Sequence, residues 1–255
     1  MADFQVLFDN FDLNSISYVE FSRRFPNNEA PRDLLTHDLV RRPGSVLTSI
    51  KIGERSIPLE GYINAPSRTA YEQSYDELKF RTSGIEKPLI IIQGGETRKY
   101  TATKENLIEE HIEAGKTKLN LSFRCVDPYG KASVLTAATQ VVTAAPDSLS
   151  HVFLGTAEVM PIVVYTLGTI STGTNKTIGF GNSRTGQQVQ VTRNWTAGDV
   201  VSFDCDKKRA YVNGAVSDYS GVFPVFYPGN ASAYYTDDLT SRSVTTELSY
   251  AKQYL

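Results

Sequence analysis

The sequence predicts a mostly β protein with two domains, of which the first contains a helix and the second contains none. The chain has 255 residues, and its hydrophobic content of 40% is enough for packed cores. A chain of this length is comfortable for two domains of roughly 100–150 residues each. From Leu149 onward, short strand-like runs alternate with turn residues at a spacing of roughly 8–12 residues, which is typical of an antiparallel sandwich.

The first strands are followed by a segment of different composition. Residues 1–20 indicate two strands around a turn at Asp12–Ser15. Residues 21–45 combine prolines and asparagines with basic residues, so they predict a loop or an extended arm instead of a regular element. Its arginines are Arg23, Arg24, Arg32, Arg41 and Arg42. Two interpretations are open: a solvated excursion, or an arm whose arginines pair with carboxylates on a neighbouring subunit.

A hairpin is predicted directly after this segment. Val46–Ile52 and Arg55–Tyr62 are the expected strands, and Gly53-Glu54 is the expected turn. Because side chains alternate between the two faces of a strand, Val46, Ile50 and Ile52 are expected on one face.

The clearest helix is predicted at Ser67–Ser83. Ser67 can cap its first turn, and Gly84 can end it in the left-handed conformation. Tyr71, Tyr75 and Leu78 recur with helical spacing and form one apolar stripe. In a chain rich in strands, we expect this stripe to pack across a sheet.

Between this helix and residue 126, the sequence predicts a second hairpin, a short helix and a strand. Lys87–Gln93 and Thr97–Thr103 flank Gly94-Gly95, which is a strong hairpin signal. In Lys104–Ala114, apolar side chains share a helical face, which indicates a second short helix. In Lys116–Val126, apolar and polar residues alternate, which predicts a strand.

The domain boundary is predicted within residues 131–150, where small and polar residues predominate. We place an N-terminal domain, a β-sandwich with its helix, at residues 1–145, with the arm at about residues 21–45. The second domain, an antiparallel β-sandwich, is placed at residues 146–255.

The composition argues against several classes of partner. The 26 basic and 28 acidic residues give a net charge of −2, so nucleic-acid binding is not expected. No apolar run approaches the ~18 residues that a membrane span needs, and the first residues do not resemble a signal peptide. We therefore expect no membrane insertion. We expect the protein to be made and assembled in a cytoplasm. Cys125 and Cys205 are expected to be buried thiols.

No catalytic residue, metal site or cofactor site is predicted. His37, His111 and His151 do not have the spacing of metal ligands. Asp204 and Asp206 fall where turns are expected, so a catalytic acid pair is a weak alternative.

One aromatic residue is a candidate for glycan contact. Trp195 is the only tryptophan, and together with Asn194 it precedes a predicted turn. An exposed indole can stack on a sugar, whereas the simpler interpretation places Trp195 at the edge of the sandwich core.

Several stretches, taken in order, resemble the siphophage distal tail protein (Dit) family. In the first half they are Tyr75–Lys79, Lys87–Ile91, Arg98–Ala102 and Leu121–Tyr129. In the second half they are Leu154–Pro161, Gly198–Asp204, Val212–Gly214, Phe223–Pro224, Tyr227–Asn230 and Tyr250–Leu255. Their order and spacing carry the resemblance, which extends over nearly the whole chain.

This resemblance implies a structural protein of the bacteriophage virion, not an enzyme, with no cofactor. It implies a homohexameric ring of N-terminal domains, with galectin-like domains at the periphery and a last strand that can return to the first domain. Such a ring joins the tail tube protein to the tail-associated hub protein at the tail tip or baseplate, and it can carry receptor-binding proteins. The alternative is a carbohydrate-binding module that attaches to host cell-surface glycans.

Overall fold

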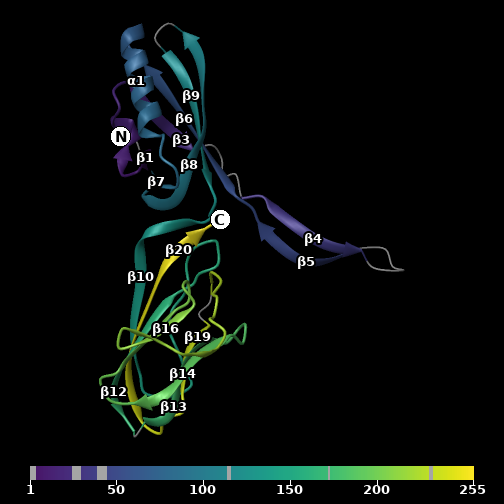
Figure 1. The fold of residues 1–255 in the computed structure, drawn as a ribbon, viewed down its shortest axis with the longest axis vertical. Helices are drawn as coiled ribbons and strands as arrows, with labels where there is room; N and C mark the ends of the chain where they lie inside the picture. Colours follow the sequence, from purple (N-terminus) through teal and green to yellow (C-terminus); the bar gives the residue numbers. More distant parts are fainter. Residues whose placement is uncertain (1–3, 25–29, 39–44, 114–115, 172, 230–231) are drawn as a thin grey trace. The chain divides into compact units, whose positions relative to one another are not determined.

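The chain folds into two compact units made almost entirely of strands (Figure 1). The computed structural model describes residues 4–24, 30–38, 45–113, 116–171, 173–229 and 232–255. One unit comprises Met1–Ser133 together with Leu255, and the other comprises Val134–Tyr254. The predicted class, mostly β with a helix in the first half, is confirmed.

The first unit is a β-sandwich in which two sheets share a strand. Its elements are β1 (Phe4–Phe8), β2 (Phe11–Asp12), the 3-10 turn η1 (Leu13–Ser15), β3 (Val19–Arg24), β4 (Arg32–Asp38), β5 (Ser45–Ile52), β6 (Arg55–Asn64), α1 (Arg68–Arg81), β7 (Lys87–Gln93), β8 (Glu96–Glu113), β9 (Lys116–Cys125) and the start of β10 (Gly130–Val142). One sheet has the order β2-β1-β7-β8-β10 and the other has the order β3-β6-β9-β8. Apolar side chains of both sheets meet in one core, where the rings of Phe8 and Phe123 stack at 4.9 Å.

The predicted helix is present and is held at both ends by side chains. The Ser67 hydroxyl accepts a hydrogen bond from the Ala70 N–H at 3.2 Å, as expected for the N-cap. Leu78 is buried, and Tyr71 and Tyr75 pack against the core, so the predicted apolar stripe is confirmed. The predicted way in which the helix ends, at a left-handed Gly84, is wrong. The helix ends at Thr82, whose hydroxyl donates to the Leu78 carbonyl at 2.7 Å, and Gly84 is not left-handed.

The second short helix predicted at residues 104–114 is wrong, because this segment is the second half of β8. Gln93 pairs with Glu96 and closes the tight turn at Gly94-Gly95 that the sequence predicts. Strand β8 then continues to Glu113. From Thr103 to Glu113 its backbone pairs with β9, so a ladder of inter-strand hydrogen bonds replaces those of a helix. The alternation predicted for β9 is confirmed by its buried Leu119, Leu121, Phe123 and Cys125.

The arm prediction requires two corrections. Part of residues 21–45 is regular, because β3 continues to Arg24 and β4 begins at Arg32. The predicted hairpin around Gly53-Glu54 is wrong, because β5 pairs with β4, whereas β6 pairs with β3 and β9. Gly53 instead closes the base of the β4–β5 ribbon, where its N–H donates to the Pro31 carbonyl at 2.8 Å.

The second unit is an antiparallel sandwich of two sheets. Its strands are β11 (Asp147–Ser148), β12 (Ile162–Ile170), β13 (Gly173–Asn182), β14 (Gln188–Trp195), β15 (Val200–Asp204), β16 (Arg209–Val212), β17 (Ala215–Ser217), β18 (Ser220–Gly221), β19 (Ala233–Asp237) and β20 (Arg242–Tyr254), with most of β10. One sheet has the order β17-β16-β15-β12-β20-β10 and the other has the order β11-β19-β13-β14-β18. Tyr165 of the first sheet meets Tyr235 of the second at 5.0 Å, edge to face.

Residues 131–150 are more regular than their composition indicates. β10 occupies Gly130–Val142, and the division between the units falls inside this strand, between Ser133 and Val134. Its Lys131 pairs with Lys99 of β8, and the strand also lies beside β20 in the second unit. Among the described residues, no helix has the length and apolarity to cross a bilayer.

Candidate assembly surfaces

An exposed apolar face belongs to the ribbon formed by β4 and β5. In the described part of the chain these two strands pair only with each other. Leu34 lies opposite Ile50, and Thr36 lies opposite Leu47, so Leu34, Leu47 and Ile50 share one face. Each exposes about half of its surface or more. A two-stranded ribbon is marginally stable on its own in water, so this face calls for a covering partner.

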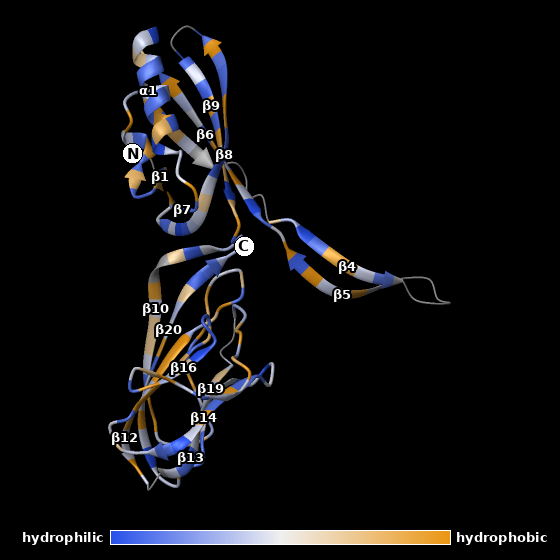
Figure 2. Ribbon diagram, viewed as in Figure 1, coloured by the Kyte–Doolittle hydropathy of each residue, from blue (hydrophilic) through white to orange (hydrophobic). Residues whose placement is uncertain are grey.

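The sequence placed the apolar residues of β5 on a face in a slightly different way. A bulge between Leu35 and Thr36 on one strand and Ser49 and Leu47 on the other inserts Thr48 as an extra residue. The bulge puts Leu47 opposite Thr36 and therefore on the face of Ile50, which the alternation of a regular strand does not predict. Bands of orange on β4 and β5 mark the apolar positions (Figure 2).

The arginines predicted to lie on the arm are distributed over different elements. Arg23 and Arg24 end β3, where they pair in register with Glu60 and Leu59 of β6. Arg32 opens β4. Arg41 and Arg42 lie outside the described residues. The structure therefore brings only Arg32 onto the described part of the ribbon, and the carboxylate-pairing role of the five arginines stays a prediction.

A second surface lies along β8. Pairing with β7 ends at Ala102, and residues 104–113 pair only with β9 among the described strands, so the other edge of β8 has no strand beside it there. Ile108 lies opposite Asn120, and Leu107 lies opposite the buried Leu121, so Ile108 faces away from the core. Ile108 is 56% exposed and Ile112 is 53% exposed.

The sequence analysis did not predict this surface, because it assigned residues 104–114 to a helix. In a helix, Ile108 and Ile112 share the core-facing stripe with Leu107 and His111, whereas in β8 the first two residues are exposed. Residues 104–113 of the strand are acidic as well as apolar, because Glu105, Glu109, Glu110 and Glu113 accompany a single lysine, Lys104.

Helix α1 and the segment that precedes β7 contact residues 103–109 of β8. The Tyr71 hydroxyl donates to Glu109, and the pKa of Tyr71 is raised by burial and by this carboxylate. Further along, Lys104 Nζ donates to the Lys79 carbonyl at 3.5 Å, and the pKa of Lys104 is lowered by burial and by the nearby Lys79 ammonium. These contacts fix the helix beside β8.

Phe80 and Ile85 extend this border with exposed apolar surface. They are 73% and 74% exposed, the highest values among the large hydrophobic side chains of the described residues. The Glu86 N–H, next to Ile85, donates to the hydroxyl of Thr103 at 2.9 Å, which places this segment beside the start of the free edge.

The structure places Trp195 in the core of the second unit. Its ring is 3% exposed, and its indole N–H donates to the Lys176 carbonyl at 2.8 Å. The side-chain oxygen of Asn194 accepts a hydrogen bond from the Asn175 N–H at 2.7 Å. Because a sugar can stack only on an exposed ring face, this geometry favours the core interpretation over the glycan contact.

The acidic residues, the cysteine and the histidine that could take part in catalysis or metal binding make contacts that stabilise the fold. Asp204 is buried in a turn, where it accepts from the Lys207 N–H and pairs with the Lys207 ammonium at 3.1 Å, while Asp206 is exposed. Burial raises the pKa of the Cys205 thiol well above its ordinary value. His111 contacts the Thr117 hydroxyl at 2.9 Å, and no metal-binding group of side chains occurs among the described residues.

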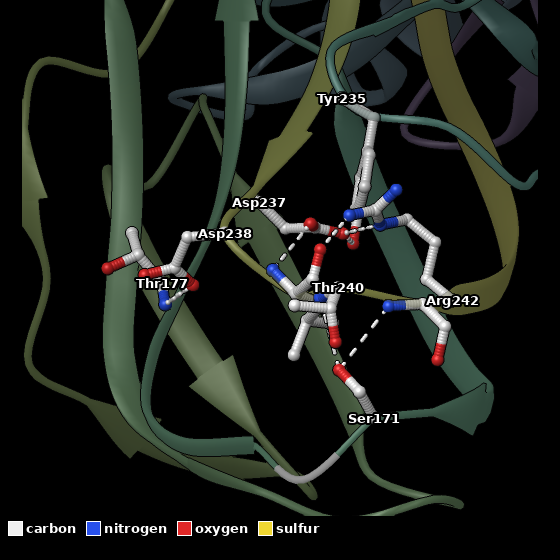
Figure 3. A network of polar contacts seen from close by, with 9 residues as sticks. Ser171, Thr177, Tyr235, Asp237, Asp238, Thr240 and Arg242 are labelled. Carbon is white, nitrogen blue, oxygen red and sulfur yellow. Dashed lines mark hydrogen bonds and ion pairs between the residues drawn. The ribbon is translucent and has the colours of Figure 1, made fainter.

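A buried ion pair closes the end of the second sandwich (Figure 3). The Asp237 side chain has no exposed surface; it forms an ion pair with Arg242, whose Nε lies at 2.8 Å, and accepts a hydrogen bond from the Tyr235 hydroxyl. Its other oxygen accepts from the Leu239 N–H at 2.9 Å. The Ser171 hydroxyl accepts from the Thr240 N–H at 3.1 Å. This network ties the β19–β20 turn to the end of β12, so its role is structural.

Comparison with known proteins identifies the class of these domains. Residues 154–254 match the family model described as the C-terminal domain of a siphovirus-type tail component. No protein with curated annotation matches the chain in sequence. Residues 154–254 therefore have the C-terminal domain of a siphovirus-type tail component.

Solved structures extend the likeness to the whole chain. The crystal structure of the SPP1 Dit protein, whose title calls it a paradigm of the hub adsorption apparatus in phages that infect Gram-positive bacteria, matches with a TM-score of 0.70 at 17% identity. The match covers 99% of both chains, which shows a common fold. Structures of the phage p2 baseplate in its activated conformation, with Sr and with Ca, give TM-scores of 0.43 and 0.42 at 10% identity, covering 98% of this chain and 97% of theirs. The resemblance to the distal tail protein family is confirmed.

Proposed function

We propose that the chain forms a hexameric ring at the phage tail tip, assembled in the host cytoplasm, that links the tail tube to the tail-associated hub protein and carries receptor-binding proteins. The observation that carries the proposal is that the first unit has two different unpartnered surfaces. One is the apolar face of the β4–β5 ribbon, and the other is the free edge of β8. Two different surfaces that bind one another give a head-to-tail contact, which closes into a ring when the rotation allows it.

The sheet order supports a head-to-tail arrangement. In the sheet β3-β6-β9-β8, the ribbon is connected to β3 and β6, whereas the free edge belongs to β8 at the other end. The two surfaces therefore belong to different strands of the unit. The likeness to SPP1 Dit in fold agrees with such an assembly.

We also propose different roles for the two domains. We assign ring formation to a module at residues 1–145 and a peripheral, galectin-like role to residues 146–255, from which further tail proteins are carried. The last strand, β20, is paired within the second unit, and only Leu255 is grouped with the first.

Light scattering on the purified chain, with and without the tail-associated hub protein, tests the ring. A mass of six copies in either condition supports the proposal. A mass of 28.2 kDa, that of one chain, in both conditions contradicts it. The alternative function as a carbohydrate-binding module gains no support, because the side chain proposed for the glycan contact, Trp195, is buried.

A further inference from the structure

A small cavity lies within the second unit, away from both assembly surfaces. Strand β10 lines it with Gln140, β20 lines it with Thr246, and the segment that follows β11 lines it with Ser150 and His151. Its volume is about 20 Å³. A cavity needs roughly 10–15 Å³ to hold one water molecule, so this one has room for a single water and for nothing larger.

Thr246 brings an unpaired hydroxyl to this cavity. The residue is 1% exposed, and it lies on the inner face of β20, between the buried Val244 and Leu248. Its Oγ1 has no hydrogen-bond partner among the residues that the structure describes. A hydroxyl that is buried without a partner destabilises the fold, whereas a hydroxyl that binds a water molecule is satisfied. Thr246 therefore calls for a polar group inside the cavity.

His151 brings a second unpaired atom. Its ring packs edge-on against two aromatic rings, Phe153 at 5.3 Å and Tyr250 at 5.2 Å between centroids, and these contacts fix its orientation. The Nε2 atom is buried and has no hydrogen-bond partner in the described part of the chain. Burial lowers the pKa of His151, so the ring is neutral at pH 7. A neutral ring nitrogen either donates or accepts one hydrogen bond, and here that bond is unmade.

Gln140 fixes the wall of the cavity opposite β20. Its side-chain nitrogen donates to the Ser148 carbonyl at 3.1 Å, and its side-chain oxygen accepts from the Ser150 N–H at 2.9 Å. These two bonds hold the segment after β11 against β10, so the space between them does not collapse. An amide has two N–H groups and two lone pairs, so Gln140 keeps capacity for one more bond. A buried water makes about three hydrogen bonds, which Thr246, His151 and Gln140 can supply.

We infer that this cavity is a binding site for one water molecule, which bridges Thr246 Oγ1 and His151 Nε2. Water donates and accepts at once, so it satisfies a hydroxyl and a neutral imidazole together, whichever ring nitrogen carries the proton. The bridge ties the segment after β11 to the inner face of β20, as the Gln140 side chain ties it to β10. The inference concerns the second unit alone and does not depend on the proposed ring.

A crystal structure of the full-length chain, grown at pH 7 and at a resolution that shows ordered water, tests the site directly. We expect a peak of electron density within about 3.2 Å of both Thr246 Oγ1 and His151 Nε2. A cavity without density overturns the inference. A peak that contacts only one of the two atoms overturns it as well, because the water then bridges nothing.

Replacement of the hydroxyl gives a test in solution. Thr246→Val keeps the shape of the side chain, and Thr245→Val makes the same change at the exposed neighbour on the other face of β20. Urea unfolding is followed by the fluorescence of Trp195, which is buried in the same unit. With a bound water, Thr246→Val lowers the urea midpoint relative to Thr245→Val, because the water loses a partner. Without one, removal of an unpaired hydroxyl raises the midpoint, and an equal or higher midpoint overturns the inference.

A double-mutant cycle tests the bridge itself. His151→Phe retains an aromatic ring against Phe153 and Tyr250 but removes Nε2. If one water joins the two residues, Thr246→Val lowers the urea midpoint in the His151→Phe background by less than about half of its effect in the wild type. Equal decreases in the two backgrounds show that the residues act separately, which overturns the inference.

Discussion

The two units share one architecture but treat their strand edges differently. In the second unit, the edge strands β11, β17 and β18 are only two or three residues long. Along β10, the Gln140 side chain binds the Ser148 carbonyl and the Ser150 N–H, which holds a loop against that edge. In the first unit, about ten residues of β8 have an unpaired edge, and the β4–β5 ribbon has an uncovered apolar face.

The capacity for assembly therefore comes from the strand edges and apolar faces that a sandwich leaves unpaired. Each unit has its own cluster of buried apolar side chains, so the fold class alone does not distinguish the units. What distinguishes them is the backbone and apolar surface that one unit keeps available and the other does not.

The two units have separate cores, so we expect them to unfold separately. Substitutions in these cores have the largest expected effect on stability. Phe203→Ala removes a fully buried ring from the second unit, which is expected to cost about 3–5 kcal/mol in unfolding free energy. Trp195 is the only tryptophan and is buried in that unit, so its fluorescence follows this transition alone. The matched variant Phe123→Ala changes the first core. If it shifts the tryptophan transition by the same amount, the two cores are not independent.

The buried ion pair of the second unit predicts the next largest effect. Asp237→Asn retains the shape of the side chain but leaves the largely buried Arg242 without its counter-charge, which is expected to cost about 3 kcal/mol. Asp238→Asn is the control, because the Thr177 N–H donates to an oxygen that an amide also provides. Urea unfolding followed by tryptophan fluorescence compares them, and equal stabilities would show that the pair contributes nothing.

Removal of the helix cap predicts a smaller effect, confined to the first unit. Ser67→Ala removes the acceptor of the Ala70 N–H and is expected to cost about 1 kcal/mol. Far-UV circular dichroism at the helix band follows this change, because the only α-helix of the described residues is in the first unit. The tryptophan transition should not move, and a shift there would contradict the confinement.

The smallest predicted effect is a pH dependence of the second unit. Partial burial raises the pKa of Asp199, but hydrogen bonds from Asn213 and Thr196 outweigh it, so the pKa lies below its ordinary value. Stabilisation by Asp199 is therefore present above the pKa of the unfolded chain, about 3.9, and is lost as the pH falls through the lower folded-state pKa. Asp199→Asn should flatten this acid-side loss in urea titrations, whereas Asp218→Asn should leave it as in the wild type.

The sequence predicted the regular parts of this fold because local signals and tertiary structure agree there. Ser67 caps the helix, Gly94-Gly95 turns a hairpin, and β9 alternates, each by a mechanism that neighbouring residues contain. At residues 104–113 the apolar residues fit a helical stripe and a strand equally well. Only pairing with β9, a tertiary contact, decides between them.

The candidate surfaces were predicted less completely for the same reason. A basic, proline-rich segment indicated an arm, but composition does not specify that β4 pairs with β5 or that a bulge moves Leu47 onto the Ile50 face. The edge of β8 could not be found while its residues were assigned to a helix. Trp195 shows the converse, because the type of residue suggested a site and only burial shows its place in the core.

The central claim is that assembly resides in the first unit, and sedimentation of two matched variants tests it most directly. Ile108→Asp and Val216→Asp each place a charge on an exposed aliphatic residue, one on the free edge of β8 and one in the second unit. The first variant is expected to sediment as a single chain of 28.2 kDa under conditions in which the second retains the mass of the wild-type oligomer. Loss of the oligomer in Val216→Asp, with Ile108→Asp unaffected, would contradict it.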